Sequence, residues 1–200
     1  MSRTAKVIVF ALAGWSGFFV MAVELLSGRV LAPSFGNSIY VWGAVITVFM
    51  LALAVGYLAG GQISLFSPSL RRLGMLLVAA GLATLPVVFF GNAALDWIFD
   101  RVADPRYGSL LASGLLFFVP TAISGAVSPY AVRLLVSNLH ASGKSAGLLY
   151  FVSTFGSAAG TILTSFYLVL LFEVNTILLG LMTVSVALGL LAVLRRESAP

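Results

Sequence analysis

The chain has no cysteine, a single histidine and few charges, and each shortage excludes a class of protein. Without cysteine there are no disulfides, no thiol chemistry and no cysteine-ligated metal. The single histidine, His140, does not support a histidine-based metal site or a catalytic triad. The sequence also lacks a P-loop and a glycine-rich dinucleotide motif. We therefore expect no catalytic residue, no metal and no cofactor in this chain.

Charged residues make up 8% of the 200 residues, whereas hydrophobic residues make up 60%. A soluble domain carries about a quarter charged residues, so this chain could not cover its own surface in water. Its uncharged stretches reach the roughly 20 residues that a helix needs to cross a bilayer core. They lack the alternation that is typical of barrel strands. The composition predicts an all-α integral membrane protein that lies in a lipid bilayer.

Turn-forming residues divide the apolar sequence into six spans within a single domain, residues 1–200. Residues 32–38 and 64–69 are rich in the Pro, Gly, Ser and Asn that interrupt helices. The first apolar run is longer than that of a typical signal peptide and has no A-x-A site, so we expect an uncleaved first helix. The predicted spans are 7–31, 39–62, 73–92, 109–132, 146–172 and 174–194.

Residues 92–108 form the longest predicted connection, between spans 3 and 4. Its apolar side chains recur at helical spacing and its acids fall on another face, which predicts a short helix lying in the membrane interface. We expect the acids to form a solvated face, and an entrance that gathers cations is the alternative. The apolar set is Leu95, Ile98, Phe99 and Val102, and the acidic set is Asp96, Asp100 and Asp104.

The basic residues are distributed unequally between the two sides of this six-span arrangement. Positive residues collect in cytoplasmic segments, so the larger group predicts that both termini are cytoplasmic, in a bacterial-type inner membrane. No basic stripe is interleaved with aromatics, so the net charge of +5 indicates topology and not nucleic-acid binding. The larger group is Arg3, Lys6, Arg71, Arg72, Arg133, Lys144, Arg195 and Arg196, and the smaller is Arg29, Arg101 and Arg106.

Glu24 is the clearest polar residue inside a predicted span, where a charge costs at least about 2.5 kcal/mol. It shares one side of its helix with small residues that let another helix approach closely, so it would face protein or a cavity. Arg29 lies about 140° around the helix and is an imperfect partner. Glu24 is therefore either functional or a buried packing residue. The other members of this seam are Gly14, Gly17, Met21 and Gly28.

Spans 2, 4 and 5 carry further polar and small residues. In span 4, Pro120 and Pro129 remove backbone donors, which predicts helix breaks with free carbonyls, or simple kinks near Ser124. Arg133 is expected to cap the inner end of that helix, with substrate binding as the alternative. The remaining residues indicate helix-packing faces or, in span 5, a pathway lined by hydroxyls. They are Gly56, Tyr57 and Gly60 in span 2, and Tyr150, Ser153, Gly156, Ser157, Gly160 and Thr164 in span 5.

Three blocks stand in order along the chain: 24–42 (ELLSGRVLAPSFGNSIYVW), 128–134 (SPYAVRL) and 147–161 (GLLYFVSTFGSAAGT). Together they resemble the membrane domain of spermidine synthase-like integral membrane proteins. In that family a soluble aminopropyltransferase-like domain often follows, and this sequence lacks its glycine-rich loop and acids. We therefore expect no polyamine synthesis. The resemblance also implies a fold similar to one six-helix half of a major facilitator transporter.

Two functions remain open. The first is a transporter or exporter of a small polar or cationic metabolite, working as a homodimer, with Glu24 as the cation or proton site. The resemblance alone favours a polyamine-like substrate. The second is a non-catalytic membrane anchor or accessory subunit for a separately encoded soluble enzyme or a larger membrane complex. The other candidate lining residues of a transporter are Arg29, Tyr57, Ser124, Arg133, Tyr150 and Ser153.

Overall fold

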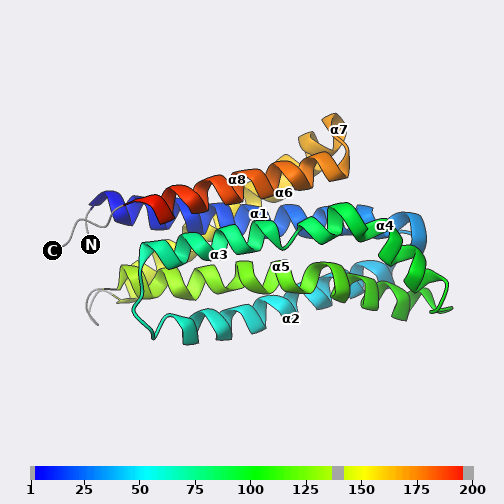
Figure 1. Cartoon of the computed structure of the whole chain (residues 1–200), viewed down its shortest axis with the longest axis horizontal. Helices are drawn as coiled ribbons and strands as arrows, with labels where there is room; N and C mark the ends of the chain where they lie inside the picture. Colours follow the sequence, from blue (N-terminus) through cyan, green and yellow to red (C-terminus); the bar gives the residue numbers. More distant parts are fainter. Residues whose placement is uncertain (1–2, 137–141, 196–200) are drawn as a thin grey trace.

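The structure, a computed structural model, describes residues 3–136 and 142–195. In these two ranges the protein is all-α, with six helices long and apolar enough to cross a membrane (Figure 1). This confirms the predicted fold class and the predicted number of spans. Spans 1, 2, 4 and 6 are α1 (Arg3–Phe35), α2 (Ile39–Ile63), α5 (Pro105–Leu135) and α8 (Val174–Leu194). Span 3 joins α3 (Leu70–Leu82) to α4 (Leu85–Phe99), and span 5 consists of α6 (Ser142–Leu163), a π-helical segment (Thr164–Leu168) and α7 (Val169–Leu171).

The first helix is longer than the sequence predicts. It continues past the predicted end at residue 31 to Phe35, with Pro33 inside its last turns. The residue after the helix is Gly36, whose φ of +75° lies in the left-handed region that favours glycine. The amide of Gly36 donates to the Ala32 carbonyl at 2.9 Å, which satisfies one of the free carbonyls at the helix end.

The helix predicted in the membrane interface is present as the end of another helix. Residues 92–99 continue α4 within span 3, so only residues 100–104 connect it to α5. Leu95 and Ile98 are buried in the core of the bundle, at 2% and 0% exposure. Their apolar face therefore packs on the protein and not on the bilayer surface, because the chain turns toward α5 only after Phe99.

Asp104 caps the first turn of α5. Its Oδ1 accepts a hydrogen bond from the Arg106 amide at 2.9 Å, and its Oδ2 lies 2.8 Å from the Arg106 guanidinium. These bonds to Arg106 hold the pKa of the Asp104 carboxyl below its ordinary value of 3.8. A carboxyl with a lowered pKa in the folded state stabilises the fold above its ordinary pKa. That contribution is lost as the pH falls through the lowered pKa.

We therefore expect the first-turn amides of α5 to exchange faster with solvent at about pH 3 than near pH 6, after correction for intrinsic exchange. Asp104→Ala should show the faster exchange at both pH values, because it lacks the carboxylate that accepts the hydrogen bond from the Arg106 amide. Hydrogen exchange followed by mass spectrometry can measure both. Equal protection of this turn in the two proteins at pH 6 would contradict the assignment.

The bundle is held together by helices that are distant in sequence. The most extensive contacts join α1 to α6, α2 to α5 and α3 to α8, and α1 and α5 also pack against each other. In terms of spans, these pairs are 1 with 5, 2 with 4, and 3 with 6. If each of spans 1–3 is exchanged with its counterpart among spans 4–6, the first pair becomes the second and the third pair is unchanged. The pairing thus has the symmetry of two equivalent three-span halves.

Residue contacts support this equivalence. A Cβ on Gly156 or Gly160 of α6 would overlap the backbone of α1 at Gly14 and Phe18 respectively. A Cβ on Gly56 or Gly60 of α2 would overlap α5 at two residues with the same spacing. Those two residues are Ala122 and Ala126.

Ser16 and Ser124 hold equivalent positions in the two halves, each two residues after the first contact residue of its helix. The Ser16 hydroxyl donates to the Ser124 carbonyl at 3.1 Å, and both residues are buried. A pseudo-twofold axis therefore passes close to this hydrogen bond. Because each half has an odd number of spans, the halves have opposite orientations across the membrane.

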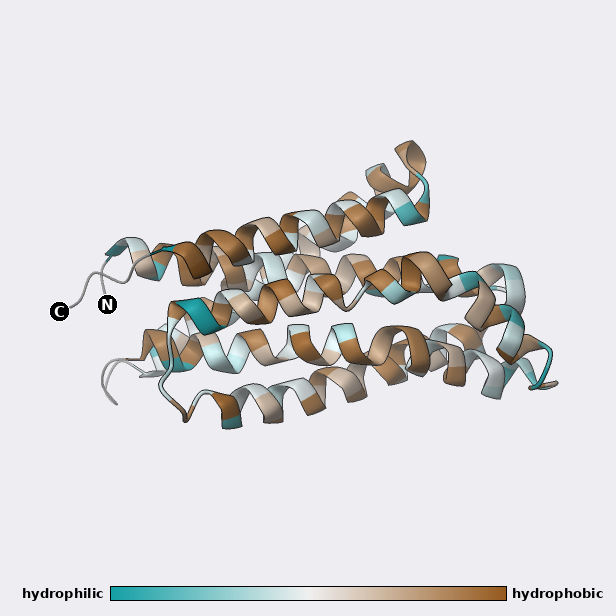
Figure 2. Cartoon of the chain, in the orientation of Figure 1, coloured by the Kyte–Doolittle hydropathy of each residue, from teal (hydrophilic) through white to brown (hydrophobic). Residues whose placement is uncertain are grey.

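Polar residues gather at the two ends of the bundle, with apolar helices between them (Figure 2). Both described chain ends lie at one end, together with the loop between α2 and α3 (Figure 1). We call this end the terminal end and the other the distal end. The distal end carries the connections α1–α2, α4–α5 and α7–α8. The buried core lies between the helices in two clusters, and Phe117 and Tyr130 of α5 are among their largest fully buried side chains.

Candidate functional site

Glu24 and Arg29, which the sequence places about 140° apart around α1, do not form an ion pair. Glu24 is partly buried on α1, and Arg29 is exposed toward the distal end. Among the residues that the structure describes, the one ion pair joins Arg106 to Asp104. The Glu24 carboxylate therefore has no basic partner in the described ranges.

Glu24 lies on the side of α1 that begins at Gly17. A Cβ on Gly17 would overlap the carbonyl of Ser153 and approach the hydroxyl of Ser157, both on α6. Glu24 is seven residues further along, which is two turns and almost the same direction around the helix. Four residues beyond it, Gly28 packs against the Trp42 ring of α2. The small-residue seam predicted on α1 thus meets two helices, α6 first and α2 next, with Glu24 between the two contacts.

One side of α6 carries a row of hydroxyl groups, which we call the hydroxyl face: Tyr150, Ser153, Thr154, Ser157 and Thr161. The Ser157 hydroxyl donates to the Ser153 carbonyl at 3.1 Å, and the Thr161 hydroxyl donates to the Ser157 carbonyl at 3.0 Å. Such internal bonds satisfy the donors and leave acceptor lone pairs available.

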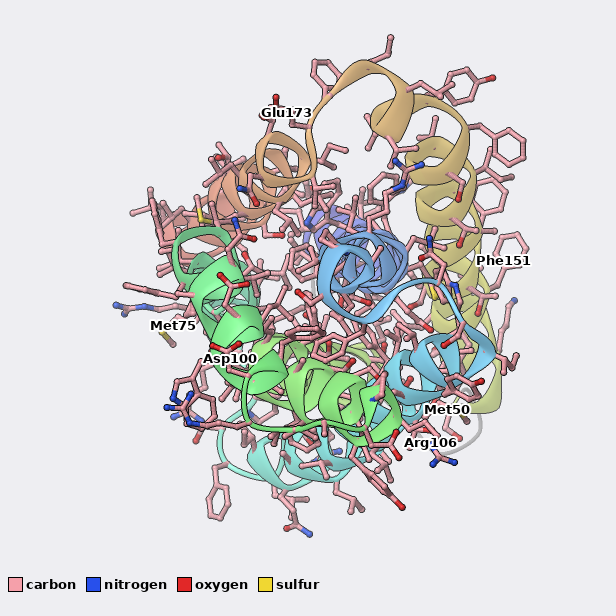
Figure 3. All side chains as sticks on the ribbon, turned by 90° about the vertical axis from the view of Figure 1, so that its right-hand side faces the viewer. Met50, Met75, Asp100, Arg106, Phe151 and Glu173 are labelled. Atoms are coloured by element: carbon pink, nitrogen blue, oxygen red, sulfur yellow. The ribbon has the colours of Figure 1, made fainter. Side chains whose placement is uncertain are left out.

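The hydroxyl face meets α1 at Ser157 and lies near α2 at Tyr150. Tyr150 lies near Tyr57 of α2, and their exposed fractions are 55% and 49%. Phe151 and Phe155 are also exposed on α6, each about 100° further around the helix than the hydroxyl-face residue before it. Viewed from the distal end, α6 stands at the edge of the bundle near Phe151 (Figure 3). The structure therefore places two of the predicted candidates, Tyr57 and Tyr150, together.

Span 5 is the least buried of the spans and contains an irregularity that the sequence does not signal. Only 11% of its most apolar window is buried inside the bundle. The π-helical segment 164–168 follows the glycines that pack on α1. Thr164 begins this segment, is fully buried and has no hydrogen-bond partner for its hydroxyl among the described residues. Single π-helical turns within α-helices are frequent at functional sites.

The two prolines of span 4 do not break the helix, so the first of the two predicted alternatives, a helix break, is wrong. Helix α5 is continuous from Pro105 to Leu135, with Pro120 and Pro129 inside it. Neighbouring helices hold the chain on both sides, which is how a membrane helix tolerates proline. The buried Ser124 hydroxyl donates to the Pro120 carbonyl at 2.9 Å. Arg133 is exposed in the last turn of α5, one turn beyond Pro129.

Two further hydrogen bonds between distant parts of the chain were not expected from the sequence. The indole of Trp15 on α1 donates to the Ser185 hydroxyl on α8 at 2.7 Å. The hydroxyl of Tyr130, which is fully buried on α5, accepts from the Ser69 amide at 3.0 Å and so holds the loop before α3. Their partners lie 170 and 61 positions away, so no local pattern indicates them.

The predicted site residues thus fall into three places. Glu24, Ser153, Tyr57 and Tyr150 lie on or beside the surfaces between α1, α6 and α2. Ser124 is buried where α1 crosses α5, and Arg29 and Arg133 are exposed on different helices. His140 and Arg196 lie outside the described residues. No family model, curated protein or solved structure matches the chain.

Proposed function

We propose that this multi-pass membrane protein is a transporter or exporter of a small polar or cationic metabolite. It works as a homodimer in a bacterial-type inner membrane, with both termini cytoplasmic. The terminal end would then be the cytoplasmic end. The described basic residues support this orientation, since seven belong to the terminal-end group and three to the distal-end group.

The observation that carries the proposal is the pseudo-twofold relation between the two three-span halves. Inverted repeats of this kind are a recurring architecture of secondary transporters, whose substrate sites lie near the bilayer midplane where the repeats meet. Here the repeats meet at the hydrogen bond between Ser16 and Ser124. A membrane anchor requires no such symmetry.

Glu24 and the hydroxyl face would supply the polar surface that a solute needs at membrane depth. Glu24 has no described ion-pair partner, and Tyr150 and Thr154 of the hydroxyl face are exposed. A second copy would cover this surface and enclose a pathway between the two chains. The resemblance to spermidine synthase-like membrane proteins makes polyamines the first substrates to test.

Glu24→Gln should lower uptake of radiolabelled spermidine into proteoliposomes at least tenfold, because it removes the negative charge that would attract a cation. Asp100→Asn, at an exposed acid in the α4–α5 connection, should leave uptake within twofold of the wild-type rate. Unchanged uptake in Glu24→Gln would remove Glu24 from the mechanism.

The alternative, an accessory membrane subunit, is favoured by the sparse burial of span 5, which leaves α6 free to contact another protein. The two functions differ in what the purified protein does alone. A reconstituted transporter moves solute without a partner. Absence of flux for every small cation tested, together with co-purification of a soluble enzyme, would support the accessory role.

A further inference from the structure

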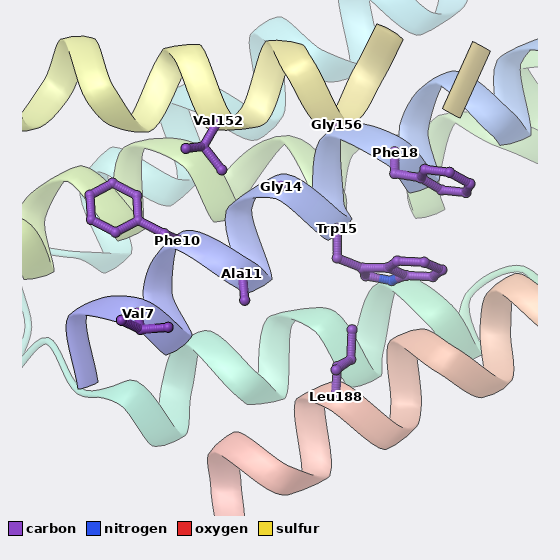
Figure 4. Close-up of a pocket in the computed structure, with 9 residues that line it drawn as sticks. All are labelled: Val7, Phe10, Ala11, Gly14, Trp15, Phe18, Val152, Gly156 and Leu188. Atoms are coloured by element: carbon purple, nitrogen blue, oxygen red, sulfur yellow. The ribbon is translucent and has the colours of Figure 1, made fainter. Parts of the chain in front are cut away.

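The side of α1 that carries Val7, Trp15 and Phe18 floors an apolar groove between α6 and α8. One part, of about 510 Å³, lies between Val7–Phe18 of α1, Val152 and Gly156 of α6, and Leu188 of α8 (Figure 4). A second part, of about 350 Å³, shares Trp15 and Phe18 with the first. It continues toward the distal end as far as Phe172 and Thr176.

The groove ends beside a polar pocket. Phe172 and Thr176 line the groove, and the residues between them, Glu173–Asn175, line a pocket of about 230 Å³. Arg29 of α1 and Asn92 of α4 complete the polar lining of this pocket. The apolar groove therefore leads to a pocket at the distal end that is lined by charged and amide side chains.

The dimensions match one leaflet of a bilayer. Phe18 and Arg29 are eleven residues apart on α1, which places them on the same side of the helix and about 16 Å apart along its axis. A hydrocarbon core of roughly 30 Å has leaflets of about half that thickness. An acyl chain that starts near Arg29 would thus reach the part of the groove at Phe18.

The charges of the pocket indicate the head group. Arg29 and Glu173 are both exposed and line the same pocket, yet neither forms an ion pair with a described residue. A guanidinium binds a phosphate through two parallel hydrogen bonds, and a carboxylate binds a primary ammonium. Two unpaired groups of opposite sign complement a zwitterion better than a simple anion.

We propose that this groove and pocket bind a glycerophospholipid with an aminoethyl phosphate head group, such as phosphatidylethanolamine. Its phosphate lies on Arg29, its ammonium on Glu173, and one acyl chain fills the groove between α6 and α8. A phosphatidylglycerol head group offers Glu173 no cation. A phosphatidylcholine head group offers it no N–H donor. The proposal does not depend on the transport function, because neither Glu24 nor a residue of the hydroxyl face lines the groove or the pocket.

Native mass spectrometry of the purified protein, after incubation with vesicles of equal parts dioleoyl phosphatidylethanolamine, phosphatidylglycerol and phosphatidylcholine, tests the assignment. We expect phosphatidylethanolamine to be retained at least threefold more than either competitor. Arg29→Gln should lower retention of all three phospholipids at least fivefold. Glu173→Gln should remove the preference for phosphatidylethanolamine over phosphatidylcholine and leave total retention nearly unchanged.

The groove itself is tested by Gly180→Leu. Gly180 lines the groove and has open space where a Cβ would be, so leucine fills the groove without a clash. Retention of every lipid should fall at least fivefold. Gly43→Leu, at another open glycine on α2, and Arg101→Gln, whose guanidinium stacks on Trp97, are matched controls that should bind as wild type.

Each assignment can be overturned separately. Wild-type lipid retention in Gly180→Leu would show that the acyl chain does not occupy the groove. Stronger retention of phosphatidylglycerol than of phosphatidylethanolamine by the wild type would refute the head group. Circular dichroism of every variant establishes that lost binding is not lost folding, and if Arg29→Gln fails to fold, Arg29→Lys with its single ammonium replaces it.

Discussion

Gly156→Val should destabilise the bundle more than any other single apolar substitution in span 5. A Cβ at Gly156 would overlap the Gly14 carbonyl oxygen, and backbone cannot move aside as a flexible side chain can. Overpacking a close contact costs typically 1–3 kcal/mol, and this site belongs at the upper end. The loss should appear as a lower midpoint of thermal unfolding in detergent, followed by intrinsic fluorescence.

Gly147→Val provides the matched control, since Gly147 is on the same helix and has open space around a Cβ. Its midpoint should stay close to that of the wild type. The equivalence of the two halves extends the prediction to α2, where Gly56→Val should behave as Gly156→Val and Gly61→Val as the control. Equal midpoints for Gly156→Val and Gly147→Val would refute the close crossing of α1 and α6.

Tyr130→Ala should have a comparably large effect at the terminal end of the bundle. Tyr130 is among the largest fully buried side chains, and removing a buried aromatic side chain costs about 3–5 kcal/mol. Its hydroxyl also holds the Ser69 amide at the start of α3. Unfolding by denaturant should therefore occur at a clearly lower concentration in this variant.

Tyr130→Phe separates the two contributions. It keeps the ring and leaves the Ser69 amide without its acceptor, which should cost about 1 kcal/mol. Hydrogen exchange should increase at Ser69 and the first turn of α3, with little change elsewhere. Tyr107→Ala, at an exposed tyrosine of the same helix, should leave stability nearly unchanged. Identical exchange at Ser69 in Tyr130→Phe and the wild type would mean that this bond does not hold the loop.

The length and charge of the apolar runs were enough to predict the six spans. Bilayer thickness sets a minimum length, and few sequences of 200 residues satisfy it six times by accident. The residues at which the helices end were less predictable. Pro33 suggested that α1 stops near residue 31, but a proline near the end of a helix removes only one donor. The chain therefore remains helical until Gly36 allows the turn.

The sequence indicated which residues lie at helix contacts but not which helices they meet. Gly14, Gly17 and Gly28 have the spacing of one seam, yet the first two pack on α6 and the last on α2. Spacing defines a direction around one helix, whereas the partner depends on how all six helices cross. The bond between Trp15 and Ser185 was unpredictable for the same reason.

The repeat was also hidden from sequence comparison within the chain. The position equivalent to Gly14 is Ala122, and the position equivalent to Phe18 is Ala126. Phe18 and Ala126 share neither size nor aromatic character. What the halves share is a close approach of backbones, which several small residues permit. Equivalence becomes visible only when the contacts of both halves are known.

The pairing of distant spans has a consequence for how the chain is made. Spans enter the membrane in order during synthesis. However, α1, α2 and α3 can pack against their main partners, α6, α5 and α8, only after those later helices have been made. The first three spans therefore reach the bilayer before the helices that cover their close-packing faces exist. Lipid, or an assisting insertion factor, must occupy the faces around Gly14 and Gly56 until the second half is complete. Ribosome-bound chains that end before α5 should accordingly be the most susceptible to membrane proteases.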